Sequence, residues 1–447
     1  MLGLGFILSF IILLYGVFKG VFIGYCLLGS YLIFFLIALK MGYSLKHILK
    51  YSWTSGKKAF VVLTIFGLIG LVTASWFSAG TIPAIVYYSM QVMIPKYFVV
   101  FAFLSSCLVS YMLGTALGTA STIGIVLIIM ARTSDININL IGGAILAGCF
   151  FGDRTSPMSS SANLVANLTG VDLYPMLKKF VKTNLIPFLV SVIIYLGFSF
   201  FNPLNVSDSL VIDQLKENYI INFIILIPAL AMLILSIFQL NVKKSMVVSI
   251  VLGSLIGVFV QGVSLADLLK TLVLGYQLGP DNPLAEIIKG GGLLSMAKPG
   301  FTIFVSCSMA GILEGMNVFS MINKYFKNIK TRSQALFTTG LVSVMTGAFG
   351  GNQSIAVVMT SEIMKELYEK ENIGSYELAT DIGNTAILFA AMIPWNIANL
   401  VPATTLSVDP LRIVPYAFYL YIVFIVNYFY LKYRDVSIRS SDNLQES

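Results

Sequence analysis

Charged side chains are absent from long stretches of this 447-residue chain. Most of these stretches reach or exceed the roughly 20 residues that a helix needs to cross the hydrocarbon core of a bilayer. Only 11% of all residues are charged, compared with about 25% in soluble domains. The sequence therefore predicts an all-α membrane protein, and it excludes a soluble enzyme, extended nucleic-acid binding and a large extramembrane domain. The uncharged segments are 2–18, 20–39, 59–95, 97–131, 183–207, 218–242, 245–266, 333–361, 382–408 and 413–431.

The distribution of basic residues predicts how the chain is oriented in the membrane. Lys and Arg cluster in five places, and such clusters are retained on the cytoplasmic side. With these clusters inside, both termini are cytoplasmic and 436–447 forms a cytoplasmic tail. Residues 1–18 lack a basic leader and are followed at once by a second apolar run, which favours a retained helix over a signal peptide. We expect a multi-pass protein of the cell membrane. The clusters are 40–58, 178–182, 243–244, 324–332 and 432–439.

Three weak internal matches occur in the same order along the chain, at offsets of 220, 233 and 236 residues. They predict two transmembrane copies, 1–207 and 218–435. The charge pattern places 178–182 inside but its counterpart 409–412 outside, so the copies should be inverted repeats, as in many secondary transporters. An inverted pair needs an odd number of crossings, and about five transmembrane helices fit each copy. The matches pair 44–50 with 264–270, 114–121 with 347–354, and 162–172 with 398–409.

Two uncharged segments contain glycine and small polar residues at their centres. The first, 97–131, has the cluster Gly114 to Thr119, and its counterpart 333–364 has the cluster Gly347 to Gln353. Glycine weakens the middle of a helix, so we predict two re-entrant hairpins with these clusters at their tips. Non-helical backbone at membrane depth is tolerated only where it is buried in protein or lines a watery cavity. The tips therefore supply candidate binding residues, namely Thr115, Thr119, Asn352 and Gln353.

Two further apolar segments are interrupted by polar residues and proline. Pro157 lies within the polar run 152–163, and Pro394 lies between 381–385 and 396–399. Proline removes a backbone donor, so we predict two broken helices with exposed carbonyls and a positive helix N-terminus at each break. Hydroxyls, amides and carboxylates at such a break suit a hard cation or an anion. The candidate ion or substrate ligands are Asp153, Ser156, Ser159, Ser160 and Asn163 at the first break, and Asp381, Asn384, Thr385, Asn396 and Asn399 at the second.

Structural alternatives remain open for these residues. The first polar run could be an extramembrane loop, and Asp153 could be a structural partner of Arg154. Asn396 and Asn399 could serve as interhelical hydrogen-bond donors, which are common in membrane bundles. Asp381 could cap a helix at the membrane surface.

Glu314 is a candidate proton carrier. It has no Lys or Arg in reach along its predicted helix within 300–323. A carboxyl group buried without a cation favours its neutral form, which suits a group that gains and loses protons. The alternative is a surface glutamate at the end of a membrane span.

Several kinds of chemistry are not indicated. The only histidine, His47, lies in a basic stretch, so a histidine-based catalytic triad or metal site within the membrane is excluded. The chain has no GxxxxGK[ST] loop for ATP. Its four cysteines stand singly in apolar segments, which does not indicate a disulfide framework. We expect a protein that is not an enzyme and that carries no cofactor.

The run Gly152-Asp153-Arg154-Thr155-Ser156-Pro157-Met158-Ser159 resembles the G-D-K-x-S-P-L-S signature of the NhaC-type sodium/proton antiporter family. That family includes malate/lactate exchangers and belongs with the ion transporter superfamily. The segments 79–88, 114–119 and 393–396 also agree with it, and the similarity spans roughly residues 40–430. The sequence departs from the family at Ser160, where an intramembrane aspartate is usual, and at Ala116 and Leu117, where serine and tryptophan are usual.

The resemblance implies inverted repeats in which hairpin tips meet broken helices and hold sodium there, with Asp153 and Asp381 as tentative sodium ligands. Matched positions are Asp153, Ser156, Ser159 and Asn163 at the first break, and Asp381, Asn384, Thr385 and Asn396 at the second. It implies a cation-coupled secondary antiporter that exchanges sodium with protons or with a small organic anion by alternating access. The alternative is a sodium-coupled carrier of a small carboxylate or amino acid. The expected partners are the lipid bilayer, the transported ion or organic anion and a second copy in a homodimer, with no nucleic acid.

Overall fold

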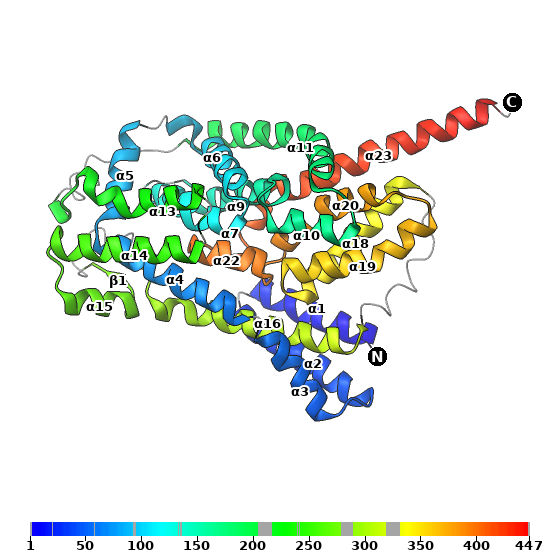
Figure 1. The fold of residues 1–447 in the computed structure, drawn as a ribbon, viewed down its shortest axis with the longest axis horizontal. Coiled ribbons are helices and arrows are strands. Elements are labelled where there is room, and N and C mark those ends of the chain that lie inside the picture. The colour runs from blue at the N-terminus through cyan, green and yellow to red at the C-terminus, as the bar shows by residue number, and fades with distance from the viewer. Residues whose placement is uncertain are drawn as a thin grey trace.

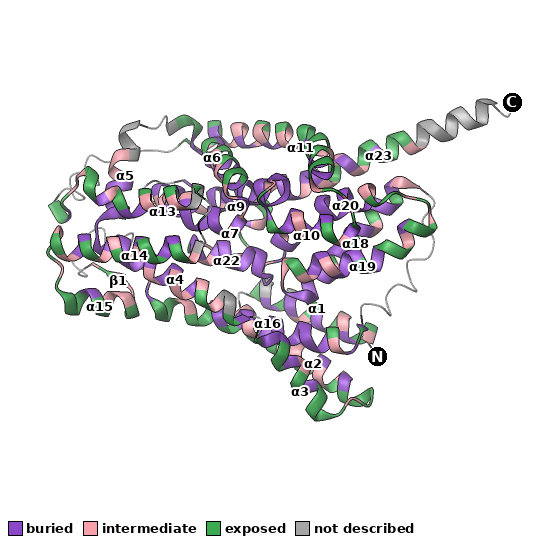
Figure 2. Ribbon diagram, in the orientation of Figure 1, coloured by how far each residue is buried: buried purple, intermediate pink, exposed green. Residues whose placement is uncertain are grey.

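The computed structural model describes residues 2–19, 21–57, 59–92, 95–132, 134, 136–203, 217–238, 240, 242–278, 289–318 and 331–445. Most of these residues are helical, and most helices run along the long axis of the molecule (Figure 1). Buried residues concentrate where the helices face one another, whereas exposed residues lie mainly on the outside (Figure 2). The all-helical prediction is confirmed at this level. Among the described residues, strands occur only in a short antiparallel ladder of β1 (Tyr276–Gln277) and β2 (Lys289–Gly290).

The first half of the chain begins with apolar helices that match the predicted segments closely. Several helices start at a side chain that accepts a backbone N–H, such as Ser44 and Asn137. The helices are α1 (Leu2–Lys19), α2 (Ile23–Lys40), α3 (Leu45–Gly56), α4 (Ala59–Ser78), α5 (Thr81–Val92), η1 (Pro95–Tyr97), α6 (Phe98–Leu113), α7 (Ala116–Thr119), the π-helical η2 (Ala120–Gly124), α8 (Ile125–Arg132), α9 (Ile138–Thr155), α10 (Ser160–Thr169) and α11 (Leu173–Phe201).

The second half contains more short helices, and its last helix is long. The predicted tail 436–447 continues this last helix as far as Gln445. The helices are η3 (Phe223–Leu226), α13 (Ile227–Ile237), α14 (Val242–Phe259), α15 (Leu265–Leu274), η4 (Leu293–Met296), α16 (Ala297–Gly315), α18 (Arg332–Gly350), α19 (Gln353–Lys370), α20 (Ser375–Asn384), α21 (Ala386–Met392), α22 (Ile397–Thr405), η6 (Val414–Tyr416) and α23 (Phe418–Gln445).

The order of elements from α6 to α11 recurs from α18 to α23. Gly114 ends α6 with φ +64°, and Gly351 ends α18 with φ +63°. The next residue in each case, Thr115 or Asn352, caps the following helix. The members of each pair are 237 residues apart. The sequence match aligned Gly114 with Gly347, which lies one helical turn before Gly351. That match was therefore wrong, because the counterpart of Gly114 is the glycine that adopts the left-handed conformation.

Three of the described helical segments are long and apolar enough to cross a membrane: α2, α11 and Leu293–Gly315. The pair Ser375–Met392 and Ile397–Thr405 also qualifies if it is counted as one span, which is bent by 52°. The N-terminal helix and the end of α23 lie on the same side of the molecule (Figure 1). The cytoplasmic location of both termini stays a prediction.

Candidate functional site

The first predicted helix break lies between α9 and α10. Helix α9 ends at Thr155 and α10 begins at Ser160, so the break is narrower than the predicted run 152–163, and Asp153 still belongs to α9. Ser159 caps α10, because its hydroxyl accepts the N–H groups of Ser161 and Ala162 at 3.1 Å. The Asn163 amide donates to the Ser159 carbonyl at 2.7 Å. The loop alternative for this run is wrong, since its polar residues are mostly buried between helices.

The second break separates α21 from α22. Asn396 caps α22 by accepting the Ala398 N–H at 2.9 Å, and its amide donates to the Gly347 carbonyl at 2.7 Å. Asn399 donates to the carbonyls of Ala391 and Pro410 at 2.8 and 3.1 Å. Both asparagines therefore hold the broken helix to neighbouring backbone, as their structural alternative predicts.

The two glycine turns pack against these breaks. A Cβ atom on Gly114 would lie 2.6 Å from the backbone carbon of Met158 and 2.8 Å from the backbone nitrogen of Ser159. The carbonyl of Gly351 accepts the N–H of Ile397 at 3.0 Å. Glycine is required at position 114 both by its positive φ and by this close approach. Each turn thus lies directly beside a helix break.

Asp153 lies where these elements meet. Its carboxylate is almost fully buried, with 4% of the residue exposed. Oδ2 accepts hydrogen bonds from Ser161 Oγ at 2.9 Å and from Gln353 Nε2 at 2.8 Å, and the carboxylate also accepts the backbone N–H of Ala116. The donors come from α10, α19 and α7, so the carboxylate lies where the first helix break meets the helices that follow the two glycine turns. Within the described residues, no cation pairs with it.

Ser161 is a site residue that sequence reasoning missed. It follows the predicted Ser160 directly, but Ser160 is exposed whereas Ser161 is buried against Asp153. Adjacent residues on a helix point about 100° apart, so the start of α10 decides which serine faces inward. The sequence signal that could have distinguished Ser160 from Ser161 is Ser159, because serine is favoured at the N-cap position that starts a helix. Gln353, a predicted candidate binding residue, lies at the start of α19, and its Oε1 accepts a hydrogen bond from Ser161 at 3.3 Å.

In four other predicted residues, the side-chain oxygen forms a hydrogen bond with a nearby backbone group. These residues stabilise the turns and breaks and do not contact Asp153. Thr115 Oγ1 accepts from Gly118, Thr119 Oγ1 donates to the Thr115 carbonyl, Ser156 Oγ accepts from Met158, and Asn352 Oδ1 accepts from Ser354.

Arg154 is fully buried and points away from Asp153, so the predicted alternative of an Asp153–Arg154 pair is wrong. Its guanidinium lies over the Phe180 ring at 5.0 Å, and Nε has no hydrogen-bond partner in the described structure. No carboxylate among the described residues pairs with it. The guanidinium donates to Tyr419 Oη at 3.4 Å, the Phe180 carbonyl at 3.4 Å, Thr183 Oγ1 at 3.0 Å, and Asn384 Oδ1.

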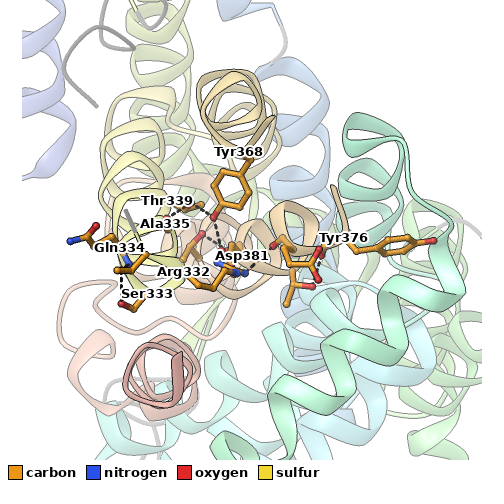
Figure 3. A network of polar contacts seen from close by, with 12 residues as sticks. Arg332, Ser333, Gln334, Ala335, Thr339, Tyr368, Tyr376 and Asp381 are labelled. Atoms are coloured by element: carbon orange, nitrogen blue, oxygen red, sulfur yellow. Dashed lines mark hydrogen bonds and ion pairs between the residues drawn. The ribbon is translucent and has the colours of Figure 1, made fainter. Parts of the chain in front are cut away.

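Asp381 lies in a separate polar network around Arg332 (Figure 3). Arg332 donates to both carboxylate oxygens, with Nη2 to Oδ1 at 2.8 Å, and the Tyr368 hydroxyl donates to Oδ2. Asp381 lies inside α20, so the helix-cap alternative is wrong. Thr385 Oγ1 donates to the Asp381 carbonyl. The structure therefore separates the two predicted sodium ligands, and the charge of Asp381 is already balanced by an arginine.

Glu314 is not buried, although its predicted role as a proton carrier requires burial. It is exposed at the end of α16, where its carboxylate accepts a hydrogen bond from Ser55 at 3.4 Å. The prediction of a buried glutamate was wrong, and the alternative of a surface glutamate at a span end is correct. The burial on which the predicted proton-carrier role depended is therefore absent.

Comparisons with known proteins agree on one family. The sequence profile of the Na⁺/H⁺ antiporter family matches residues 148–433. The Na⁺/H⁺ antiporter NhaC of Bacillus subtilis is 26% identical over 392 residues, which cover 86% of each chain. The malate-2H⁺/Na⁺-lactate antiporter of the same species is 25% identical over 421 residues, 91% of this chain and 88% of the relative. The arginine/ornithine antiporter ArcD of Halobacterium salinarum is 26% identical over 369 residues, 80% of this chain and 75% of the relative.

Proposed function

Because this chain belongs to the Na⁺/H⁺ antiporter family, we propose that it exchanges sodium for protons at a single central site built on Asp153. The chain is a cation-coupled antiporter and not an enzyme. It is a multi-pass membrane protein, and we place it in the plasma membrane. Its expected transported ions are sodium and protons, with no cofactor.

The observation that carries this proposal is the environment of Asp153. An ionised carboxylate is costly to bury unless a cation or strong hydrogen bonds compensate it. Asp153 has only neutral donors around it among the described residues, from Ser161, Gln353 and Ala116. Either a sodium ion or a proton would remove its charge. Because sodium and a proton compete for the same carboxylate and cannot bind to it together, Asp153 alone could exchange them without a second carboxylate.

The other candidate carboxylates support a one-site scheme. Asp381 is paired with Arg332, and Glu314 is exposed. Oxygen atoms suited to a hard cation lie beside Asp153, on Ser161 and Gln353. This scheme also accommodates Ser160, since the missing family aspartate is not needed when Asp153 alone alternates between the two ions.

Competition between the two ions can be tested by pH. As pH falls, protons occupy Asp153, so the apparent KM for sodium should rise by up to about tenfold per pH unit below the pKa of the site, as linkage requires for one proton. The maximal rate at saturating sodium should change little. The measurement is sodium uptake into proteoliposomes across a pH series with a fixed pH gradient. A sodium KM that stays constant while the maximal rate falls would show that protons act elsewhere.

We further propose that the repeated order of elements reflects two inverted repeats, 1–207 and 218–435. On this proposal α6 to α8 and α18 to α19 are re-entrant hairpins, and the helices broken after Thr155 and Met392 meet them at the bilayer midplane. The burial of both glycine turns against the breaks supports it, because irregular backbone at that depth must be covered by protein. Rocking of one repeat against the other would then expose Asp153 alternately to the two sides.

Labelling of single cysteines tests the inverted topology. In a background lacking the four native cysteines, a cysteine at Lys178 should react with an impermeant thiol reagent only from the cytoplasmic side. A cysteine at Asp409 should react only from outside, because the charge pattern places the two connections on opposite sides. Labelling of both from one side would contradict inversion. The predicted outer connection near 208–217 falls almost entirely outside the described residues.

Exchange of a small organic anion is a second candidate, and Arg154 favours it. A buried guanidinium that lacks a carboxylate partner in the described structure is the group of choice for binding a carboxylate. A sodium-coupled carrier of a carboxylate or amino acid would use the same group. Uptake of a panel of labelled solutes into proteoliposomes, with and without a sodium gradient, separates these candidates from sodium/proton exchange. We also expect a homodimer, which mass photometry of the purified protein would test.

A further inference from the structure

A groove of about 510 Å³ lies between α2, α3 and α16, and we propose that it binds an anionic phospholipid. Four apolar side chains of its lining are between 38% and 52% exposed, namely Leu28, Leu49, Trp53 and Phe301. Helix α2 and the segment that contains α16 are both candidate membrane spans. A groove that opens between two such spans faces the acyl chains of the bilayer and not water.

Three lysines lie side by side along α3 and form a basic rim beside this groove. Lys46, Lys50 and Lys57 are exposed, and at about 100° per residue they fall within about 40° of one another around the helix. Trp53, which lines the groove, lies within about 60° of each of them. The Lys57 ammonium lies 5.6 Å from the centre of the Trp53 ring. The basic rim therefore borders the groove directly.

The basic rim keeps most of its positive charge. Among the described residues, Lys46 and Lys50 have no ion-pair partner, and Lys57 contacts a neutral ring that leaves its charge uncompensated. The helices α2, α3 and α4 contain no acidic residue, and α16 contains one, Glu314. Glu314 can offset at most one of the three lysines, so at least two positive charges remain for a phosphate headgroup.

The packing of α3 on α16 puts the basic rim at the level of the headgroups. Helix α16 ends a candidate span at Gly315, and a Cβ atom there would lie 2.4 Å from the Tyr51 ring. Tyr51 and its neighbour Lys50 therefore lie at the end of that span. Lys57 lies farther along α3, but its ammonium reaches back over Trp53, four residues nearer the start of the helix. Lysine side chains near a membrane surface extend toward the headgroups in this way.

The apolar lining continues inward from the basic rim. The Trp53 ring meets the Phe304 ring edge to face, with 6.2 Å between their centres. Phe304 and Phe301 lie about three and four helical turns inside the end of α16 at Gly315. Charge at the membrane surface with an apolar groove below it matches a phospholipid headgroup and its acyl chain. A soluble anion would use only the lysines.

Lipid retention by the purified full-length protein tests the proposal. The probes are dioleoyl phosphatidylglycerol, which is anionic, and dioleoyl phosphatidylcholine, which is zwitterionic, with bound lipid counted by native mass spectrometry. Phosphatidylglycerol should be retained selectively, and equal retention of the two lipids would overturn the proposal. The double variant Lys46→Gln/Lys50→Gln should retain phosphatidylglycerol on the order of tenfold less, since each basic residue near a membrane surface contributes roughly fivefold in affinity. Both side chains are exposed, so the variant should unfold at the same temperature as the parent protein.

The charge control is Lys365→Gln/Lys370→Gln on α19, which removes the same charge from exposed positions outside the groove. This variant should retain phosphatidylglycerol as the parent protein does. Equal retention by the Lys46→Gln/Lys50→Gln variant and this control would overturn the proposal. Glycerol 3-phosphate provides a soluble headgroup without acyl chains, and it should bind far more weakly than phosphatidylglycerol. Equal binding of the two would also overturn the proposal, in favour of a site for soluble anions.

The apolar part of the groove is tested by Leu49→Asn, which should reduce lipid retention without changing the response to glycerol 3-phosphate. Its matched control is Leu45→Asn, one turn earlier on α3, at an exposed position outside the groove lining. Equal lipid retention by these two variants would contradict an acyl chain in the groove. Native mass spectrometry also reports the number of protein copies. A dimer that Leu49→Asn dissociates while lipid retention stays unchanged would assign the groove to a second copy and overturn the proposal.

Discussion

Replacing Asp153 by asparagine should abolish cation-coupled transport while leaving the protein folded. Asparagine has nearly the same shape and can still accept hydrogen bonds from Ser161 and Ala116, so the junction of α7, α9, α10 and α19 should keep its packing. It carries no charge and cannot take up a proton. Changes in the groups that merely orient metal ligands already cost about 10- to 100-fold in affinity, so loss of the ligand itself should weaken sodium binding by at least about 100-fold.

Glu314→Gln is the matched control for this experiment. It makes the same change from carboxylate to amide, but at an exposed position near Ser55. Its sodium uptake and its pH dependence should equal those of the parent protein in proteoliposomes. Thermal unfolding in detergent checks that both variants are folded. A well-folded Asp153→Asn protein with normal sodium-dependent transport would remove Asp153 from the proposed cation site.

Breaking the buried ion pair should have the largest effect on stability. Arg332→Gln leaves the carboxylate of Asp381, whose side chain is 2% exposed, without its cation. Removal of one partner of a buried pair costs about 3–5 kcal/mol because an uncompensated charge remains. The expected result is a sharp drop in folded yield and in unfolding temperature. Asp381→Asn should also destabilise the protein, but less, because Arg332 is partly exposed and can be hydrated.

The double variant Arg332→Gln/Asp381→Asn separates a structural role of Asp381 from a role in binding sodium. Removing both charges leaves neutral side chains that can still hydrogen-bond to each other and to Tyr368, so stability should recover most of the loss of Arg332→Gln. If the pair is structural, this double variant also transports sodium. A double variant that is stable but inactive would show that Asp381 itself is needed by the ion, as the family resemblance implies.

The amino-acid sequence alone determined the class of the protein and the approximate positions of two helix breaks and of the first glycine turn. Uncharged length is a local property that predicts membrane spans, and Pro157 and Gly114 interrupt helices through their own backbone chemistry. The two breaks and the first turn therefore lie where they were predicted. The resemblance at 152–159 likewise agrees with the family that the comparisons identify.

Only the tertiary structure decided which side chains form the site. Gln353 reaches Asp153 across 200 positions of sequence, and Arg332 reaches Asp381 across 49. Ser161 replaces Ser160 as the contact because the orientation of each helical side chain depends on the residue at which the helix starts. Burial also depends on tertiary packing, because a carboxylate is buried only where other parts of the chain pack over it. Sequence spacing fixes neighbours within one helix, whereas contacts between helices arise only when the helices pack together.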